Sequence, residues 1–148
     1  MIRYRLATID QIHHVLEMMA EFNAIDGYSF EEKTSRDNLA EFIGNFDLGR
    51  LWLIYHGTAV VGYVVLTFGY SFEYMGRDAF VDELYLKPTF RGRGIGRDTM
   101  EFVEKRAFEL GVKALHLEVE QGNDPGLKLY QNRDFRVNDR FLMTKRMR

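Results

Sequence analysis

The start of the chain alternates apolar and basic residues in a pattern typical of a strand that leads into a helix. Apolar residues at positions 2, 4 and 6 are separated by arginines, which is the period of a half-buried strand. Thr8 and Gln11 have the spacing of a capping box, and apolar residues then recur at helical spacing up to Phe22. The pattern predicts a strand over 2–6 and a helix from about Thr8 to about Asn23.

A second helix is predicted on a smaller apolar face. Apolar residues at positions 39, 42 and 43 fall on one side of a helix that would run from about Arg36 to Ile43. Thr34 or Ser35 is the expected capping residue, because a short hydroxyl side chain satisfies the first free amides of a helix.

From Arg50 the chain changes to segments rich in β-branched and aromatic residues. The first covers 50–55 and the second covers 59–68, with the turn residues His56 and Gly57 between them. A loop around 75–77 leads to a third such segment, 79–86, which Lys87 and Pro88 end. These segments predict an antiparallel meander of three strands.

The last third of the chain returns to helical spacing and then alternates again. Apolar residues predict a long helix that begins near Ile95 and ends at Gly111, followed by a strand over 114–120. Asn123 or Asp124 then caps a short helix, and a final strand is expected over 140–147. The order of elements predicts an α/β fold with a mixed, mostly antiparallel central sheet flanked by helices.

Composition and charge narrow the function classes. No linker or repeat divides the 148 residues, so we expect a single domain over 1–148. The absence of cysteine excludes disulfide scaffolds, thiolate metal sites and cysteine nucleophiles. A formal charge of −2 argues against a nucleic-acid partner, and no stretch has the length of a membrane helix or the core of a signal peptide. We therefore expect a cytoplasmic protein without a membrane partner.

The most informative motif is a glycine-rich loop between a predicted strand and a predicted helix. Glycines let backbone amides approach a ligand closely, and a helix N-terminus favours negative charge, so a phosphate or pyrophosphate fits this loop. The loop lacks the lysine and hydroxyl of a Walker A motif, and a dinucleotide fingerprint would need a third glycine where Arg97 stands. The remaining pattern is Arg91, Gly94 and Gly96 at the spacing Arg-x-x-Gly-x-Gly.

This pattern resembles the acetyl-CoA pyrophosphate loop of the GNAT superfamily of N-acetyltransferases. A second motif, Asn123-Asp124-Pro125 followed by Tyr130 and Phe135, resembles the Asn…Tyr motif of diamine- and polyamine-type members. The resemblance covers nearly the whole chain and departs at Asp134, where a glycine commonly precedes the aromatic residue. It implies a sheet that splays between the strands at 79–86 and 114–120 to admit acetyl-CoA. The cofactor-binding residues that it implies are Leu84, Tyr85, Leu86, Arg91, Gly92, Arg93, Gly94, Ile95, Gly96, Arg97, Asn123, Pro125 and Tyr130.

The same resemblance suggests how acetyl transfer would run. An alkylamine is almost wholly protonated near neutral pH, so a carboxylate must take its proton before attack. Asp82 and Glu83 are the two candidates, and because side chains alternate along a strand, only one of them easily faces the acceptor. The residues leave the choice open. The family's usual proton donor to the departing thiolate corresponds to Tyr130.

The acceptor is the least constrained part of the prediction. Carboxylates and aromatic rings could hold a cationic primary amine of a polyamine, an aminoglycoside or an amino-acid-like molecule. The candidates are Asp26, Tyr28, Glu31, Tyr70 and Tyr74. Acetylation of a protein lysine or N-terminus, and a non-catalytic acyl-CoA sensor, remain alternatives. The four histidines lack a ligand-like spacing, so no metal is expected, and a homodimer is possible because relatives form them.

Overall fold

The structure is a computed structural model that describes residues 1–26 and 30–147. The chain divides into two compact units, Met1–Leu117 and Glu118–Arg148, and each unit is described by itself. Among the described helices, none has both the length and the apolar character that crossing a membrane requires. A single domain over 1–148 stays a prediction.

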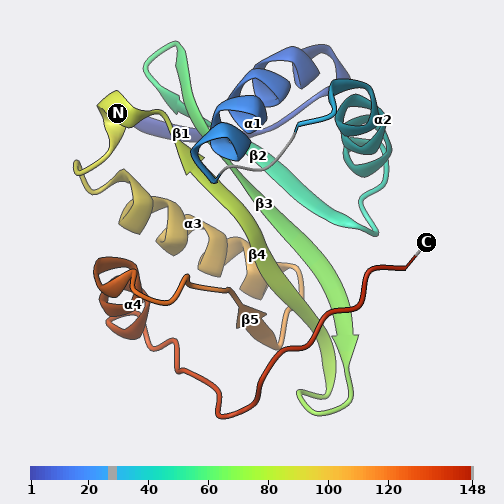
Figure 1. Cartoon of the computed structure of the whole chain (residues 1–148), viewed down its shortest axis with the longest axis vertical. Helices are drawn as coiled ribbons and strands as arrows, with labels where there is room; N and C mark the ends of the chain where they lie inside the picture. Colours follow the sequence, from blue (N-terminus) through green and yellow to red (C-terminus); the bar gives the residue numbers. More distant parts are fainter. Residues whose placement is uncertain (27–29, 148) are drawn as a thin grey trace. The chain divides into compact units, whose positions relative to one another are not determined.

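The first unit is built on a five-stranded sheet in the order β1-β2-β3-β4-β5 (Figure 1). Its first four strands are antiparallel neighbours, whereas β5 runs parallel to β4. The strands are β1 (Ile2–Leu6), β2 (Gly49–His56), β3 (Ala59–Ser71), β4 (Gly76–Leu86) and β5 (Ala114–His116). The predicted mixed, mostly antiparallel sheet is therefore confirmed.

Three helices cover the two faces of this sheet (Figure 1). On one face, α1 (Ile12–Asp26) and α2 (Glu32–Ile43) bury Leu53 and Tyr63 of the sheet. On the other face, α3 (Ile95–Glu109) packs its buried side chains against residues such as Trp52 and Leu66. Both layers follow from the apolar spacing of the helices and from the alternation along the strands.

The first helix begins as its sequence predicts. A 3₁₀ turn over Ile9–Gln11 precedes α1, and the side chain of Gln11 accepts a hydrogen bond from the backbone amide of Thr8 at 3.0 Å. That contact belongs to the predicted capping box. The helix extends to Asp26, slightly beyond its predicted end.

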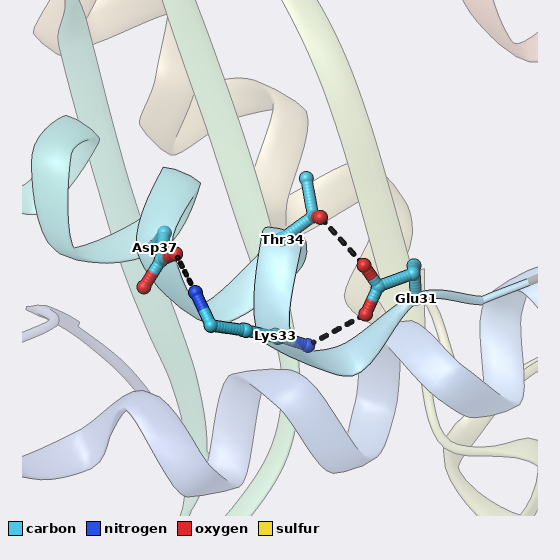
Figure 2. Close-up of polar contacts among 4 residues, drawn as sticks. All are labelled: Glu31, Lys33, Thr34 and Asp37. Atoms are coloured by element: carbon cyan, nitrogen blue, oxygen red, sulfur yellow. Dashed lines mark hydrogen bonds and ion pairs between the residues drawn. The ribbon is translucent and has the colours of Figure 1, made fainter.

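The predicted start of the second helix is wrong by one turn. α2 begins at Glu32 because the carboxylate of Glu31 caps it, accepting hydrogen bonds from the backbone amide of Lys33 at 3.1 Å and from the hydroxyl of Thr34 at 2.6 Å (Figure 2). Thr34 thus lies inside the helix and donates to the cap. An ion pair of 3.2 Å between Lys33 and Asp37 stands in the first turns of the helix. Because these residues are polar, the sequence has no apolar repeat there that predicts where α2 begins.

Two strand boundaries also differ from the prediction. β3 and β4 continue beyond the core as a two-stranded ribbon in which Tyr70 pairs with Arg77 and Ser71 pairs with Gly76. The turn therefore covers 72–75 instead of 75–77. β5 ends at His116, short of the predicted 120. In contrast, Gly111 has a left-handed φ of 80° and closes α3 as predicted.

In the second unit, the short helix is confirmed and the final strand is wrong. α4 (Asp124–Gln131) is capped by Asn123, whose side chain accepts from the amide of Gly126 at 3.1 Å, and Pro125 lies in its first turn. Residues 140–147 form no strand, and Phe141 is 96% exposed. A strand needs a partner for its backbone and burial for one face. This segment has three consecutive apolar residues, then a threonine and two basic residues, instead of an alternating pattern.

Candidate active site

A β-bulge lies in β4 at the two candidate carboxylates. On β3, Val65 pairs with Glu83, whereas the next residue, Leu66, pairs with Val81. Asp82 is therefore the extra residue, and a bulge of this kind changes the direction of the side chains that follow it. The prediction that only one of the two carboxylates easily faces the acceptor assumed a regular strand, in which side chains alternate strictly between the two faces. In the structure Asp82 is exposed and Glu83 is half-buried.

Beyond the bulge, β4 has no described pairing with β5. The β4–β5 ladder pairs Asp78 with Ala114, Ala79 with Leu115 and Phe80 with His116, and it ends there. The stretch 83–86 pairs with β3 on one edge, and its other edge therefore has backbone groups with which a ligand could pair. This gap lies between the two strands where the resemblance implied a splay.

A cavity of about 250 Å³ lies at this end of β4, lined by Phe22, Leu84, Tyr85, Leu86 and Arg91. Arg91, the first residue of the glycine motif, donates its Nε–H to the carbonyl of Leu86 at 2.8 Å. Its guanidinium also lies 5.3 Å from the centre of the Tyr85 ring. The structure thus brings the strand residues and the arginine that the sequence analysis grouped for cofactor binding to one cavity.

The glycine loop has the backbone conformation that only glycine adopts readily. Gly92 and Gly94 have φ angles of 73° and 80°, and Gly94 is the N-cap of α3. A Cβ placed on Gly92, Gly94 or Gly96 would meet no atom within 4 Å, so open space lies where these residues face. The first turn of α3 has backbone amides without helical partners, and the helix dipole favours an anion there. Ile95 is buried and holds the turn to the core, while Arg93 and Arg97 are exposed.

Contacts with the first strand hold α3 in place. The hydroxyl of Tyr4 donates to Asp98 at 2.5 Å and lies 3.2 Å from the hydroxyl of Thr99. The rings of Tyr4 and Phe102 stack with their centres 4.1 Å apart. Burial, with the hydrogen bond to Asp98, raises the pKa of Tyr4 above its usual range, so the phenol remains a donor.

Two tyrosine–glutamate pairs lie on the α1 side of β4. Tyr63 is fully buried, and its hydroxyl donates to Glu83 at 2.6 Å. The hydroxyl of Tyr85 donates to Glu21 at 2.7 Å. Burial, reinforced by the charge of Glu83, raises the pKa of Tyr63. Sequence reasoning missed Tyr63 and Glu21, because the bulge that directs Glu83 toward Tyr63 has no simple signal in the sequence.

The second unit contains the predicted residues of the second motif. Tyr130 lies near the end of α4, its ring centre is 6.0 Å from that of Phe135, and burial raises the pKa of its hydroxyl. Asp134 has a φ of 70°, so this aspartate adopts the left-handed conformation at the position where the resemblance leads us to expect a glycine. The side-chain oxygen of Asn123 caps α4.

The predicted acceptor residues lie in two different regions of the first unit. Glu31 caps α2, and hydrogen bonds from Thr34 and Lys33 lower the pKa of its carboxyl. Tyr70 and Tyr74 belong to the β3–β4 ribbon and its turn, which Figure 1 shows at the opposite end of β4 from the end of α1. Asp26 is the last residue of α1, and Tyr28 falls outside the described residues.

The β3–β4 turn has polar neighbours that sequence reasoning also missed. The Nε2 atom of His116 lies 3.1 Å from the carboxylate of Asp78, which links β5 to β4. The Tyr74 and Phe80 rings lie 5.4 Å and 4.9 Å from the His116 ring, centre to centre. His116 is isolated in the sequence and gains these partners only through the parallel pairing of β5.

Comparison with known proteins identifies the family. The sequence model of the Acetyltransferase (GNAT) family matches residues 15–135, and the chain belongs to this family. A thialysine N-epsilon-acetyltransferase from Bos taurus is 36% identical over 75 residues, which are 51% of this chain and 44% of that protein. The chain thus spans about half the length of the curated relatives it matches.

Solved structures share the fold over nearly the whole chain. An integron cassette protein from the mobile metagenome of Cole Harbour Salt Marsh has a TM-score of 0.88 and 32% identity, covering 98% of this chain and 90% of its own. A predicted acetyltransferase with acetyl-CoA from Clostridium acetobutylicum has a TM-score of 0.80 and 18% identity, with 98% and 96% covered. At the lower identity, the likeness concerns the fold alone.

Proposed function

We propose that this chain is an acetyl-CoA-dependent N-acetyltransferase that transfers an acetyl group to the primary amine of a small molecule. The observation that carries the proposal is the junction of β4 and α3. There the strand residues beyond the bulge and Arg91 line one cavity, and the left-handed glycines follow Arg91 directly in the chain. Membership of the GNAT family supports acetyl-CoA as the ligand of this junction.

The residues at the junction have the donors that this cofactor requires. Backbone amides from Gly92 to Arg97 would hold the pyrophosphate, because the open glycine faces let an anion approach the helix N-terminus. The backbone of 84–86 would hold the pantetheine arm and stabilise the carbonyl oxygen of the thioester as it becomes negative. Bound acetyl-CoA supplies the activated acetyl group, and the protein orients it.

Proton transfer would involve groups on both sides of the reaction. Asp82 or Glu83 would take the proton from the ammonium of the acceptor, directly or through one water, which leaves a neutral nitrogen to attack the thioester. Tyr130 would donate a proton to the departing thiolate. Its pKa is raised by burial, so the hydroxyl carries its proton at neutral pH. This role requires that the two units act as one domain, which the family match across 15–135 supports.

The names of the curated relatives support a small amine as the acceptor. The curated relatives are thialysine N-epsilon-acetyltransferases, which supports a free amine on a flexible side chain or chain end. Asp26, Tyr28, Glu31, Tyr70 and Tyr74 stay predictions as acceptor residues, and the cytoplasmic location and the homodimer stay predictions as well. Protein lysines and N-termini are the alternative acceptors.

A coenzyme A release assay tests this proposal. Purified protein is incubated with acetyl-CoA and, in turn, polyamines, aminoglycosides, amino acids including thialysine, and peptides. Acetyl-CoA binding is measured by calorimetry on the same sample, and Tyr130→Phe is run beside the parent. We expect turnover with at least one small amine and a lower rate in Tyr130→Phe. Tight binding without turnover on any acceptor would favour a sensor, and absence of acetyl-CoA binding would refute the proposal.

A further inference from the structure

Tyr63 is a buried phenol whose hydrogen-bond partner is one of the two candidate bases. Its side chain has 0% exposure in the core cluster that α1 and the sheet form together. A buried phenol needs an acceptor, and Tyr63 finds one in the Oε1 atom of Glu83 at 2.6 Å. That distance is typical of a hydroxyl bound to an ionised carboxylate. The contact therefore favours the charged form of Glu83.

The bulge in β4 is what makes this contact possible. Tyr63 pairs with Tyr85, and Glu83 pairs with Val65 on the same side of the sheet. If β4 were regular, Glu83 would lie on the α3 side, because one residue of register reverses every side chain. The extra residue, Asp82, places Glu83 beside Tyr63 and remains exposed itself.

We propose that Tyr63 is a positioning residue that holds Glu83, and not Asp82, as the carboxylate that accepts the proton of the acceptor amine. The inference rests on the proposed acetyltransferase function. A carboxylate has about four acceptor sites on two oxygens, so a hydrogen bond to one oxygen leaves capacity to accept a proton. Tyr63 keeps its own proton throughout and fixes the direction of the carboxylate.

The bonds and protons of the step balance with the groups already named. Glu83 takes one proton from the ammonium, and the nitrogen lone pair forms the N–C bond to the acetyl carbon. As the tetrahedral intermediate collapses, the C–S bond breaks and the thiolate receives a proton from Tyr130. The nitrogen releases its surplus proton and Glu83 releases the proton it took, both to solvent, while Tyr130 takes one proton back from solvent. The step therefore yields the amide, free coenzyme A and one net proton, and both residues are restored for the next cycle.

Other charged groups surround this pair. Asp82 and Tyr85 of β4 are close enough to affect the titration of Tyr63. Tyr85 in turn contacts Glu21 of α1 and the guanidinium of Arg91. Because these groups remain in place when only the hydroxyl of Tyr63 is removed, a change in the titration of Glu83 can be assigned to that hydroxyl.

The test is a double-mutant cycle measured as a function of pH. Rates of coenzyme A release are compared for the parent, Tyr63→Phe, Glu83→Gln, Asp82→Asn and the double variant Tyr63→Phe/Glu83→Gln. Tyr55→Phe is the control, because it removes a phenol oxygen at the edge of the same core cluster without touching either carboxylate. Thermal stability and acetyl-CoA binding are measured for every variant.

We expect Tyr63→Phe to lower kcat about tenfold and to move the acidic limb of the pH profile up by about one unit, with the KM for acetyl-CoA unchanged. Glu83→Gln should lower the rate by about 10²-fold or more, and the double variant should equal Glu83→Gln alone. Tyr55→Phe should match the parent. Additive losses in the double variant, or a larger loss in Asp82→Asn than in Glu83→Gln, would overturn the inference.

A second measurement does not depend on turnover. The ¹³C chemical shift of the Glu83 carboxyl, titrated by NMR, should show a midpoint about one pH unit higher in Tyr63→Phe than in the parent. An unchanged midpoint would refute the positioning role. If the parent released no coenzyme A but the midpoint moved, the proposed function would fail while the Tyr63–Glu83 coupling stood.

Discussion

Three glycine-to-alanine variants separate what the glycine loop does for folding from what it does for binding. Gly94 and Gly57 have φ angles of 80° and 62°, and a Cβ on either would meet no atom within 4 Å. Alanine in this left-handed conformation costs about 1–2 kcal/mol per residue, so both variants should lose that much stability. At about 2–4 °C per kcal/mol, the melting temperature should fall by roughly 2–8 °C.

Gly96 is predicted to behave in the opposite way. It lies in the first turn of α3, its φ is not positive, and a Cβ there also meets open space. Alanine should therefore stabilise the folded protein by up to about 0.5 kcal/mol, because glycine costs more backbone entropy on folding. The added methyl would stand where a pyrophosphate approaches the helix N-terminus, so acetyl-CoA affinity should fall by roughly tenfold or more, about 1.4 kcal/mol.

The assay is a thermal melt and a calorimetric acetyl-CoA titration for the parent and the three variants. Gly57→Ala is the matched control, since it has the strain of Gly94→Ala in a hairpin turn between β2 and β3. We expect it to lose stability and keep the parent's affinity. The reasoning fails if Gly96→Ala binds acetyl-CoA as tightly as the parent, or if Gly57→Ala weakens binding.

Three further predictions concern contacts away from the loop. Tyr4→Phe removes the hydrogen bond to Asp98 and should cost about 1 kcal/mol in urea unfolding; an unchanged midpoint would contradict this. Glu31→Gln should weaken the cap of α2 and lower the melting temperature with the KM for the amine unchanged, whereas a severalfold higher KM would show that Glu31 binds the acceptor. Burial and a hydrogen bond to Glu21 raise the pKa of Tyr85 from 10.0 to about 12, so stability should fall as pH rises through that window. As pH rises through the same window, the free energy of unfolding of Tyr85→Phe should fall less than that of the parent.

The elements that pattern alone predicts are those with strong periodicity or a specific cap. The meander, α3 with its closing Gly111 and α4 with its Asn123 cap all match, because their local preferences agree with their burial. The start of α2 failed because a glutamate from outside the predicted helix supplies the cap. The final strand failed because apolar residues alone do not provide a pairing partner.

The candidate site was predictable only where a motif carried it. The glycine motif singled out Arg91, and the structure places this arginine beside the strand residues of 84–86. The direction of Glu83 depends on a one-residue bulge, and the partner of His116 depends on the register of a parallel strand. Both are decided by long-range pairing, which local composition does not encode.

Neighbouring strands of the sheet are joined by connections of very different lengths, and this affects the order of folding. β2, β3 and β4 are joined by short turns, whereas β1 joins β2 across both helices of one face and β5 joins β4 across α3. Closing a long loop costs entropy before any contact compensates for it, so we expect the central meander to form first and β5 and the glycine loop to dock late. Alanine at Gly94 should therefore accelerate unfolding much more than it slows folding. The junction that would bind acetyl-CoA would then also be the part of the first unit that opens earliest, and a bound ligand would extend the lifetime of the native state there.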